Sequence, residues 1–390
     1  MNKEYERVLD GLPAAPDFQF NWDKLNATCL KPLIDGMRAT QQNPGWHGEG
    51  DVWTHTKMVC GELERMEAFR SLPDRQRTGL ALAALLHDAG KIHTTRMEDG
   101  ILVSPGHALT GSQMARTLLW TELGLSGSEE AQRIRETACL LIRYHTTPLH
   151  LVKDEDAVRR ARRIASNGRT AADFTLNALF MLAEADVRGR ICADQAEQLD
   201  EIELARLLAE EAGCLTGPYA FPSECTEYAY LSGRNVWENQ ALFDDCWGEA
   251  IILCGLPGTG KDTWIQKNCP SLPVVSLDDI RRAMKIRPEE NQGVVIQAAR
   301  EQAKVHLRAH QPFVWNATSL TPTLRQNQTG LFENYGAAVR IVYLETEWQE
   351  NLERNENRRY AVPEPVFMRM LDKLEPPEAF EARKVEWLIV

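Results

Sequence analysis

Residues 250–264 read Ala-Ile-Ile-Leu-Cys-Gly-Leu-Pro-Gly-Thr-Gly-Lys-Asp-Thr-Trp. The apolar run 251–254 stops at a glycine-rich turn, and Lys261 follows it. This order predicts a strand, a phosphate-binding loop and the start of a helix, with Lys261 reaching the β- and γ-phosphates of a nucleoside triphosphate. Glycines let the backbone fold tightly with its N–H groups pointing at phosphate oxygens, and the helix N-terminus adds partial positive charge. The glycines of this turn are Gly255, Gly258 and Gly260.

The residue after the lysine departs from the usual pattern of such loops, which places Ser or Thr there to hold Mg²⁺. Here that residue is Asp262, and Thr263 follows it. Three interpretations stay open: Asp262 binds the cation directly, binds it through water, or leaves it to Thr263. We therefore predict a site for ATP or another nucleoside triphosphate with Mg²⁺, which also includes Thr259.

The length and composition of the chain limit the class of protein to which it can belong. The chain has 390 residues, enough for two or three domains. No apolar run reaches the ~18 residues of a membrane span, and the charged N-terminus lacks the apolar core of a signal peptide. The nine cysteines form no CxxC pair, which indicates reduced thiols. We expect a cytoplasmic protein with no membrane partner.

The acidic charge is unevenly distributed. The net charge is −12, yet residues 249–390 hold 18 basic and 19 acidic side chains, so −11 falls in residues 1–248. Seven of the nine histidines lie in that first part as well. A site for several divalent cations would produce such a composition, because the cations offset carboxylate charge. An ordinary acidic surface would produce it too.

Helical periodicity dominates the first half of the chain. Residues 75–90 predict a strongly apolar helix that begins after Asp74 as N-cap and stops at Gly90. We see no convincing strand there, so this half is predicted to be all-α. The other predicted helices cover residues 107–121, 129–144, 155–165, 171–188 and 194–212. The predicted domains are an irregular lead-in (1–22), a helical domain (23–215), an ordered aromatic-rich connector (216–248) and an α/β domain (249–390).

Histidines and aspartates near predicted helix ends form a candidate metal site, because imidazole and carboxylate together suit Mn²⁺, Fe²⁺, Co²⁺, Ni²⁺ or Zn²⁺. Over residues 45–215 the chain resembles the HD phosphohydrolase superfamily, most specifically at His-Asp-Ala-Gly-Lys, residues 87–91. The resemblance implies an all-α metal-dependent phosphohydrolase with two divalent metals. By that resemblance the ligands of the first metal are His55, His87, Asp88 and Asp186. Those of the second are His107 and His145, with Asp88 shared.

The chemistry of two such cations is to clamp phosphoryl oxygens and activate a water. Lys91 and Arg190 would then neutralise the phosphate and its developing charge. The alternatives are a helix C-terminal cation for Lys91 and a plain surface side chain for Arg190. His47 is a candidate substrate-side residue, whereas His93 and His150 are expected to be bystanders.

The second half of the chain alternates between strands and helices. Strands are predicted at 251–254, 273–277, 313–316 and 338–344, and helices at 263–268, 279–285 and 293–309. This alternation predicts a parallel sheet of P-loop type. Ligands should gather at the carboxyl ends of its strands. Arginines at 354, 358 and 359 suggest a helix that breaks into a lid, or a solvated face paired with Glu353 and Glu356.

Over about residues 250–375 the chain resembles the polynucleotide 5′-kinase family of the phage type. The motifs that carry this are the glycine-rich loop, Asp278-Asp-Ile-Arg281 and the arginine segment before Val362-Pro363. The resemblance implies that Asp278 is the general base, with Asp279 as a rival, and that phosphoryl transfer is stabilised by cations. By this resemblance Arg281 grips a phosphate of the acceptor strand, and Arg358 is the lid arginine on the donor phosphates. Thr318 and Arg354 are further candidate substrate-binding residues, and Arg325 is a weaker substrate candidate.

Together the two halves resemble the bacterial HD-domain polynucleotide kinase–phosphatases. The resemblance implies phosphorylation of 5′-hydroxyl ends of RNA or DNA and removal of 3′- or 2′-phosphates or 2′,3′-cyclic phosphates, with possible coupling to a ligase. The acidic charge predicts modest, salt-sensitive binding of strand ends. Two alternatives stay open: an HD nucleotidase fused to a kinase for nucleosides or other small alcohols, and an ATP-sensing regulatory or defence module.

Overall fold

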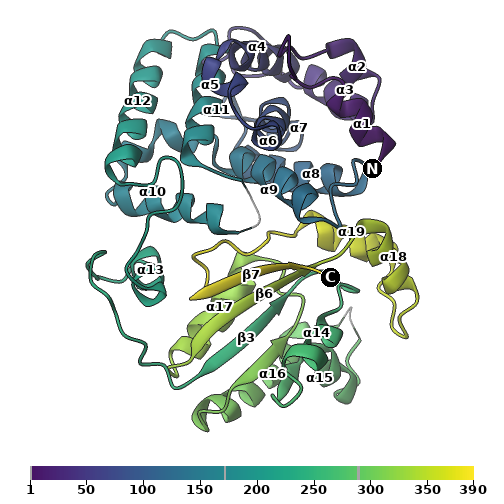
Figure 1. Cartoon of the computed structure of the whole chain (residues 1–390). Helices are drawn as coiled ribbons and strands as arrows, with labels where there is room; N and C mark the ends of the chain where they lie inside the picture. The colour runs from purple at the N-terminus through teal and green to yellow at the C-terminus, as the bar shows by residue number, and fades with distance from the viewer. Residues whose placement is uncertain (1, 171–172, 288–289) are drawn as a thin grey trace. The chain divides into compact units, whose positions relative to one another are not determined.

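The computed structural model describes residues 2–170, 173–287 and 290–390. The chain divides into two compact units, Met1–Tyr219 and Ala220–Val390 (Figure 1). Most of the predicted connector, residues 216–248, therefore lies in the second unit, where α13 (Glu224–Leu231) gives it regular structure.

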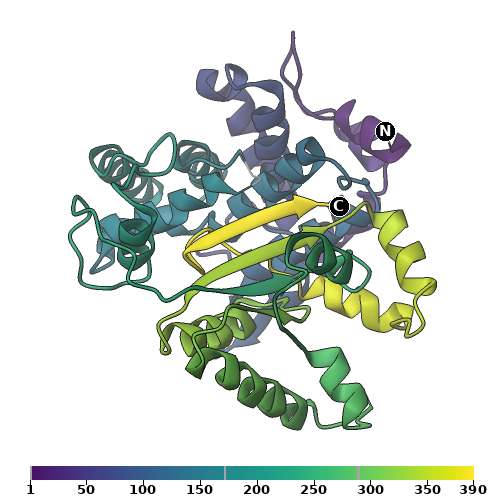
Figure 2. The same ribbon diagram turned by 60° about the horizontal axis from the view of Figure 1, so that its bottom comes forward.

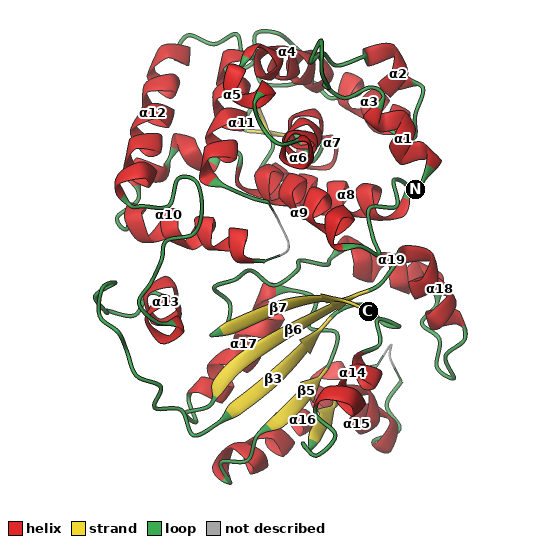
Figure 3. Ribbon diagram, viewed as in Figure 1, coloured by secondary structure: helices red, strands yellow, loops and turns green. Residues whose placement is uncertain are grey.

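Helices form nearly all of the N-terminal unit (Figure 3). Its helices are α1 (Lys3–Leu9), α2 (Trp22–Asn26), α3 (Lys31–Ala39), α4 (Val52–Arg65), α5 (Glu67–Arg70), α6 (Asp74–Leu86), α7 (Lys91–Thr94), α8 (His107–Thr121), α9 (Glu129–Tyr144), α10 (Ala157–Ala165), α11 (Leu176–Arg188) and α12 (Gln195–Glu211). Three short 3₁₀ segments are η1 (Thr147–Leu149), η2 (Leu151–Lys153) and η3 (Ser166–Arg169).

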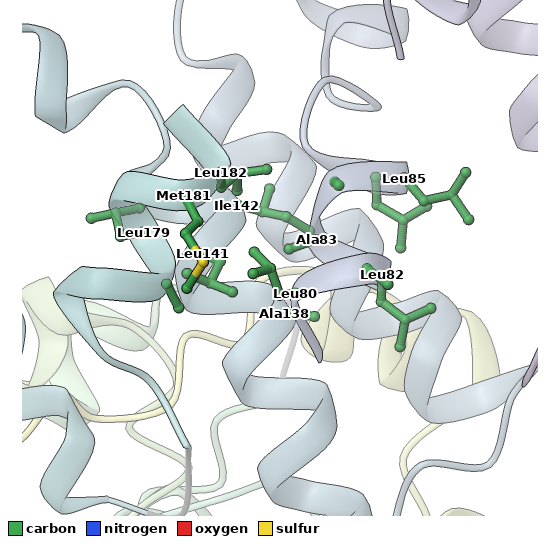
Figure 4. Close-up of a cluster of buried hydrophobic side chains, with 14 of the residues drawn as sticks. Leu80, Leu82, Ala83, Leu85, Ala138, Leu141, Ile142, Leu179, Met181 and Leu182 are labelled. Atoms are coloured by element: carbon green, nitrogen blue, oxygen red, sulfur yellow. The ribbon is translucent and has the colours of Figure 1, made fainter. Parts of the chain in front are cut away.

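The core of this unit is centred on α6. A helix that is apolar on all sides is stable only when it is surrounded, and α6 is buried from Gly79 to Leu86. It packs against α9 and α11, which contribute Ile142 and Met181 among other side chains (Figure 4). The segment that follows α6 therefore begins inside the unit, which is where His87 and Asp88 lie.

The predicted helices of the N-terminal half largely match. The ranges 107–121 and 129–144 are those of α8 and α9, and 155–165 and 194–212 differ from α10 and α12 by one or two residues. The predicted helix 171–188 begins later, at Leu176, and residues 171–172 lie outside the described chain.

Three expectations for this half are wrong. The lead-in, residues 1–22, is not irregular, because α1 buries Tyr5 and Val8; a helix this short leaves too little periodicity to detect. The unit is not all-α, because β1 (Arg96–Glu98) and β2 (Ile101–Val103) form an exposed antiparallel hairpin whose Asp99-Gly100 turn has positive φ at both residues.

The third error concerns the ends of α6. Asp74 is its first residue rather than its N-cap, which is Pro73, and the helix ends at Leu86 rather than Gly90. The backbone turns over residues 87–90 before α7 begins. This turn is what brings His87, Asp88 and Lys91 to one place.

The C-terminal unit is built on a five-stranded sheet in which all neighbouring strands are parallel, in the order β4-β5-β3-β6-β7. Figure 3 labels β5, β3, β6 and β7 in that order, and Figure 2 shows β7, in yellow, at an edge of the same sheet. The strands are β3 (Glu249–Cys254), β4 (Val274–Ser276), β5 (Phe313–Asn316), β6 (Ala338–Glu345) and β7 (Lys384–Ile389). Besides α13, the helices are α14 (Lys261–Asn268), α15 (Leu277–Ala283), α16 (Gln292–Arg308), α17 (Pro322–Glu333), α18 (Trp348–Glu356) and α19 (Glu364–Asp372).

The predicted parallel sheet is confirmed, and the four predicted strands correspond to β3, β4, β5 and β6. The sequence analysis missed β7, which pairs with β6 at the edge of the sheet. Its first four residues alternate between charged and apolar, Leu388 and Ile389 follow, and none of these residues is fully buried. Such an edge strand lacks the continuous apolar run that marks a central parallel strand. No helix among the described residues is both long and apolar enough to cross a membrane.

Candidate metal centre and nucleotide-binding loop

Six side chains of the N-terminal unit converge although they come from five regions of the chain. We call them the histidine–aspartate cluster: His55, His87, Asp88, His107, His145 and Asp186. Donor atoms of His55, His87 and Asp88 lie within 4.8 Å of one another, as do those of Asp88, His107 and His145. Asp186 Oδ1 completes the first group at 2.9 Å from His55 Nε2. The structure thus brings together all six residues that the sequence suggested as ligands.

Helix ends orient three of the imidazoles. The Nδ1 atoms of His87, His107 and His145 lie 2.9, 2.8 and 2.7 Å from carbonyl oxygens three residues earlier. A carbonyl oxygen only accepts, so each Nδ1 carries the proton. In the neutral ring the lone pair is then on Nε2, the atom that faces the cluster.

The two Nε2 atoms of His107 and His145 face each other at 3.3 Å. Burial, together with the charge of neighbouring imidazoles, lowers the pKa of both rings, and that of His145 falls to about 3. Two neutral rings whose protons are on Nδ1 present two lone pairs to each other, which is no hydrogen bond. Buried His87 Nε2 makes no hydrogen bond to any residue of the described ranges. A cation bound between these nitrogens would satisfy all three.

Asp88 lies at the centre of the cluster with 2 % of its side chain exposed. Its Oδ2 is 2.7 Å from Lys91 Nζ and 3.4 Å from His87 Nε2, and its Oδ1 is 3.5 Å from His107 Nε2. Burial would raise the pKa of this carboxyl, but Lys91 and the imidazoles hold it well below its ordinary value. An ionised carboxylate with one oxygen towards each group of imidazoles suits a bridging ligand.

The remaining cationic candidates, Lys91 and Arg190, are both paired with cluster carboxylates. Lys91 Nζ also donates to Gln42 Oε1 at 2.7 Å and lies 3.4 Å from His47 Nε2. Arg190 donates to both oxygens of Asp186, and only 14 % of its side chain is exposed. Neither residue is a solvated surface cation. His47 is buried beside Lys91, whereas His93 and His150 are exposed.

Gly90 is required by the approach of two helices. A Cβ atom there would lie 2.1 Å from the His107 carbonyl oxygen and 2.5 Å from Gly111 N. These distances are far below van der Waals contact, so only glycine lets the start of α7 meet the start of α8. This contact brings Lys91 close to His107.

Sequence analysis missed two polar residues beside the cluster, Glu49 and Gln42. Glu49 Oε1 lies 2.8 Å from Nδ1 of both His47 and His55. The available signal was the pattern His-Gly-Glu at 47–49, a carboxylate close in sequence to two histidines. Gln42 offered no comparable signal.

The glycine-rich loop in the C-terminal unit has the backbone that its sequence predicts. Gly255, Gly258 and Gly260 have φ values of +143°, +86° and +76°, which favour glycine. A Cβ at Gly255 would lie 2.4 Å from the Leu344 carbonyl oxygen. Thr259 is buried and its hydroxyl donates to the Leu256 carbonyl oxygen at 2.9 Å. The loop is therefore a closely packed backbone structure that leads into α14.

Lys261 begins α14, and its ammonium donates to the carbonyl oxygens of Gly255 and Leu256 at 3.0 and 2.7 Å. Burial lowers its pKa to about 8, with a further contribution from the charge of Arg358. Asp262 is exposed, and its Oδ1 accepts from Asn316 Nδ2 at 2.7 Å, at the carboxyl end of β5. Thr263 is exposed as well.

The predicted base and acceptor residues lie on α15. Asp278 is in the first turn of this helix, which begins directly after β4 stops at Ser276 and two residues earlier than predicted. Its Oδ1 accepts from Arg281 at 2.6 Å, and 54 % of its side chain is exposed. Its rival Asp279 pairs with Arg282 instead.

The remaining predicted contacts divide into two kinds. Arg354 pairs with Glu350 at 2.6 Å and, with Arg358, belongs to the surroundings of the loop. The Thr318 carbonyl oxygen accepts from Gly255 N at 2.9 Å, so Thr318 adjoins the loop through its backbone. Arg325 is fully buried and forms a two-point ion pair with Glu381, so its assignment to substrate is wrong. Its role is structural.

Residues 251–377 match a family model described as AAA domain. A solved structure of a proposed kinase from Chloroflexus aurantiacus J-10-fl shares 16 % identity, covers 37 % of this chain and 86 % of its own, and has a TM-score of 0.32. That score is too low to support an argument. The family match, the parallel sheet and the glycine-rich loop together show a kinase-like P-loop domain in the C-terminal unit, which implies a nucleoside triphosphate and Mg²⁺ as ligands.

Proposed function

We propose that this protein heals broken nucleic-acid ends with two active sites. The P-loop domain, residues 249–390, transfers the γ-phosphate of ATP or another nucleoside triphosphate to a 5′-hydroxyl end. The helical domain, residues 23–215, removes a 3′- or 2′-phosphate or a 2′,3′-cyclic phosphate. The products are the ends that a ligase joins, and we place this activity in the cytoplasm.

The observation that carries the phosphatase half is the convergence of lone pairs in the histidine–aspartate cluster. An unpaired polar group in the interior costs about 1–3 kcal/mol, so three unpaired imidazole nitrogens beside two carboxylates favour cation binding. One cation would be held by His55, His87, Asp88 and Asp186, and the other by His107, His145 and Asp88. Two such cations supply positive charge to the phosphoryl oxygens and an activated water.

Lys91 and Arg190 orient this site before substrate arrives. Each neutralises one cluster carboxylate, Asp88 and Asp186 respectively. When a phosphate monoester binds, the Lys91 ammonium and the Arg190 guanidinium would each contact a phosphate oxygen as well as a cluster carboxylate. Gln42 holds the Lys91 ammonium from the other side, which keeps its direction fixed.

The kinase half rests on the P-loop and on the groups around it. The loop amides and Lys261 would hold the triphosphate, Arg358 would contact the donor phosphates, and Arg354 would contact the substrate. Asp262, which accepts a hydrogen bond from Asn316, would bind the Mg²⁺ that accompanies the nucleotide, directly or through water. Asp278 would take the proton of the attacking hydroxyl, with Arg281 fixing the carboxylate and contacting a phosphate of the acceptor strand.

A polymeric acceptor is favoured by the exposure around the proposed base. Asp278 and Asp279 both have more than half of their side chains exposed. A kinase for a small alcohol has to enclose its acceptor to exclude water. An open acceptor side fits a strand end, which extends away from the site.

The test is an assay of oligonucleotides that carry a 5′-hydroxyl and a 3′-phosphate, with either sugar, in the presence of ATP, Mg²⁺ and one divalent transition metal. The proposal predicts that both ends are converted and that conversion of each end rises with strand length. Conversion of mononucleotides at the same efficiency would favour a nucleotidase fused to a small-molecule kinase. ATP binding without any transfer would favour an ATP-sensing module.

A further inference from the structure

Glu49 is a buried carboxylate outside the set of predicted metal ligands, and 1 % of its side chain is exposed. Its Oε1 lies 2.8 Å from His47 Nδ1 and 2.8 Å from His55 Nδ1. Its Oε2 accepts from the backbone N–H of Ile191 at 2.9 Å. One side chain thus contacts two imidazoles and the segment that follows Arg190.

The imidazoles fall into two classes by what holds their Nδ1 atoms. Those of His87 and His145 face backbone carbonyls in the last turns of α6 and α9, and that of His107 faces the Ser104 carbonyl just before α8. All three partners are backbone groups close in sequence to the histidine. His55 lies within α4, where the backbone carbonyls are used by the helix itself. Its Nδ1 faces Glu49, which comes from the loop before the helix.

Glu49 forms a hydrogen bond with His47 Nδ1 and places its other close contact, an ionised carboxylate oxygen, 2.8 Å from His55 Nδ1. This negative charge favours the ring form whose proton is on the facing Nδ1 atom. The lone pair of His55 is then on Nε2, which faces Asp186 at 2.9 Å and Asp88 at 3.6 Å. The same selection acts on His47, whose Nε2 lies 3.4 Å from Lys91 Nζ. The carboxylate therefore sets the direction of a predicted ligand and of its neighbour together.

The loop that carries Glu49 is fastened to the segment after α11 at two points. Gly48 N donates to the Ile191 carbonyl oxygen at 2.9 Å, and Ile191 N donates to Glu49. A Cβ at Gly48 would lie 2.9 Å from that same oxygen, so the close approach depends on glycine. This segment also carries Arg190, which holds Asp186.

We propose that Glu49 is a positioning residue for the first cation site, the one formed by His55, His87, Asp88 and Asp186. It fixes the ring of His55 and joins the loop 47–49 to the segment that carries Arg190. A carboxylate behind a ligating histidine orients the ring and raises its basicity, and loss of such a partner typically lowers metal affinity about 10–100-fold. This inference rests on the proposed metal centre.

The test compares Glu49→Gln with the wild-type chain by titration with Mn²⁺, followed by electron paramagnetic resonance. Glutamine keeps the shape, but its amide cannot accept from both histidines and from Ile191. We expect two Mn²⁺ per wild-type chain, and in the variant one site of unchanged affinity and one weakened about 10–100-fold. Glu49→Asp, which keeps the charge, should lie between the two.

Glu64→Gln is the matched control, because Glu64 is a half-buried glutamate of the same unit that accepts from a backbone N–H but does not contact the cluster. It should titrate as the wild type does. Circular dichroism measures folding of each variant; if Glu49→Gln does not fold, Glu49→Asp carries the test, with the same one-site loss to a smaller degree.

Two results have different meanings. A wild-type chain that binds no Mn²⁺ would overturn the proposed metal centre itself. A wild-type chain that binds two Mn²⁺, with Glu49 variants that bind both as tightly, would overturn only the role of Glu49. Equal weakening of both sites would also contradict it, because His107 and His145 do not contact this carboxylate.

Discussion

The two candidate sites are built in opposite ways. The histidine–aspartate cluster consists of side chains, of which five are almost fully buried, and its two carboxylates are already paired with Lys91 and Arg190. The P-loop site consists of backbone held by glycines, and its surrounding side chains, such as Asp262 and Asp278, are exposed. If the proposed function holds, folding alone assembles every protein ligand of the first site, whereas bound substrates complete the second.

This difference has a consequence for stability. Buried charges and unpaired imidazole nitrogens cost free energy until a ligand compensates them. The N-terminal unit should therefore depend on its metals for stability. The P-loop unit should depend on buried pairs away from its active site, such as Arg325 with Glu381.

The largest expected effects separate the two activities. Asp88→Asn removes the carboxylate charge shared by both cation sites and should abolish phosphatase activity while kinase activity stays.

Lys261→Ala should lower kinase activity ~10²–10³-fold, because it removes the positive charge that stabilises the phosphoryl group during transfer. It should leave phosphatase activity unchanged. End-labelled oligonucleotides measure both. A variant that loses both activities would contradict the proposal that the two active sites work independently.

A buried structural pair should matter most for the stability of the second unit. Arg325→Ala leaves Glu381 charged and unpaired in the interior, and removal of one partner of a buried pair costs about 3–5 kcal/mol. Urea unfolding measures the loss. A change below about 1 kcal/mol would mean that Glu381 finds water or another partner.

Metal removal should act on the first unit alone. A ligand at 100 times its dissociation constant stabilises the folded state by about 2.7 kcal/mol, so a chelator should lower the unfolding temperature of the N-terminal unit. Hydrogen exchange, measured separately for the two units, reports how much protection each unit loses when the chelator is added. Equal loss of protection in α14 and α16 would show that the effect is not confined to the cluster.

The exposed ion pair of Arg281 with Asp278 should affect activity more than stability, in contrast to the buried pair of Arg325 with Glu381. Arg281→Ala breaks a half-exposed ion pair, worth about 0.2–1 kcal/mol at most, and should raise KM for the oligonucleotide acceptor more than KM for ATP. Arg282→Ala, which breaks the neighbouring pair with Asp279, is the control. If the two variants behave alike, Arg281 has no special role with the acceptor.

The smallest effect concerns pH. Burial lowers the pKa of Lys261 to about 8, so the free lysine loses its proton as the pH rises through that value. A bound triphosphate favours the charged form, and nucleotide binding above pH 8 should therefore take up a proton and weaken. Calorimetry at pH 7 and pH 9 in buffers of different ionisation enthalpy measures the uptake. Lys261→Arg should show none, because guanidinium stays protonated.

Residue spacing predicted the parts of the molecule that depend on local pattern. The glycine-rich loop, α8, α9 and the central strands carry strong local signals, and the structure has them at the expected places. What was missed depends on packing between distant segments. The edge strand β7 is half-exposed, and α1 is stabilised by two buried side chains rather than by its own periodicity.

The candidate sites show the same limit. Histidines and aspartates in sequence order suggested the cluster, but nothing local indicated that Glu49 would face His55, or that Arg325 would be buried with a glutamate far along the chain. Such roles follow from which segments fold together. The sequence alone assigned Arg325 by its residue type and was wrong.

Metal content and end chemistry, both measured on one preparation of the full chain, test the proposal of two active sites in a single experiment. Mn²⁺-loaded protein with ATP and Mg²⁺ is given a 5′-hydroxyl, 3′-phosphate RNA, and each end is read separately by mass spectrometry after fragmentation. The account predicts two bound Mn²⁺ per chain, a new 5′-phosphate and a new 3′-hydroxyl. A chain that binds no Mn²⁺ and leaves both ends unchanged would contradict it.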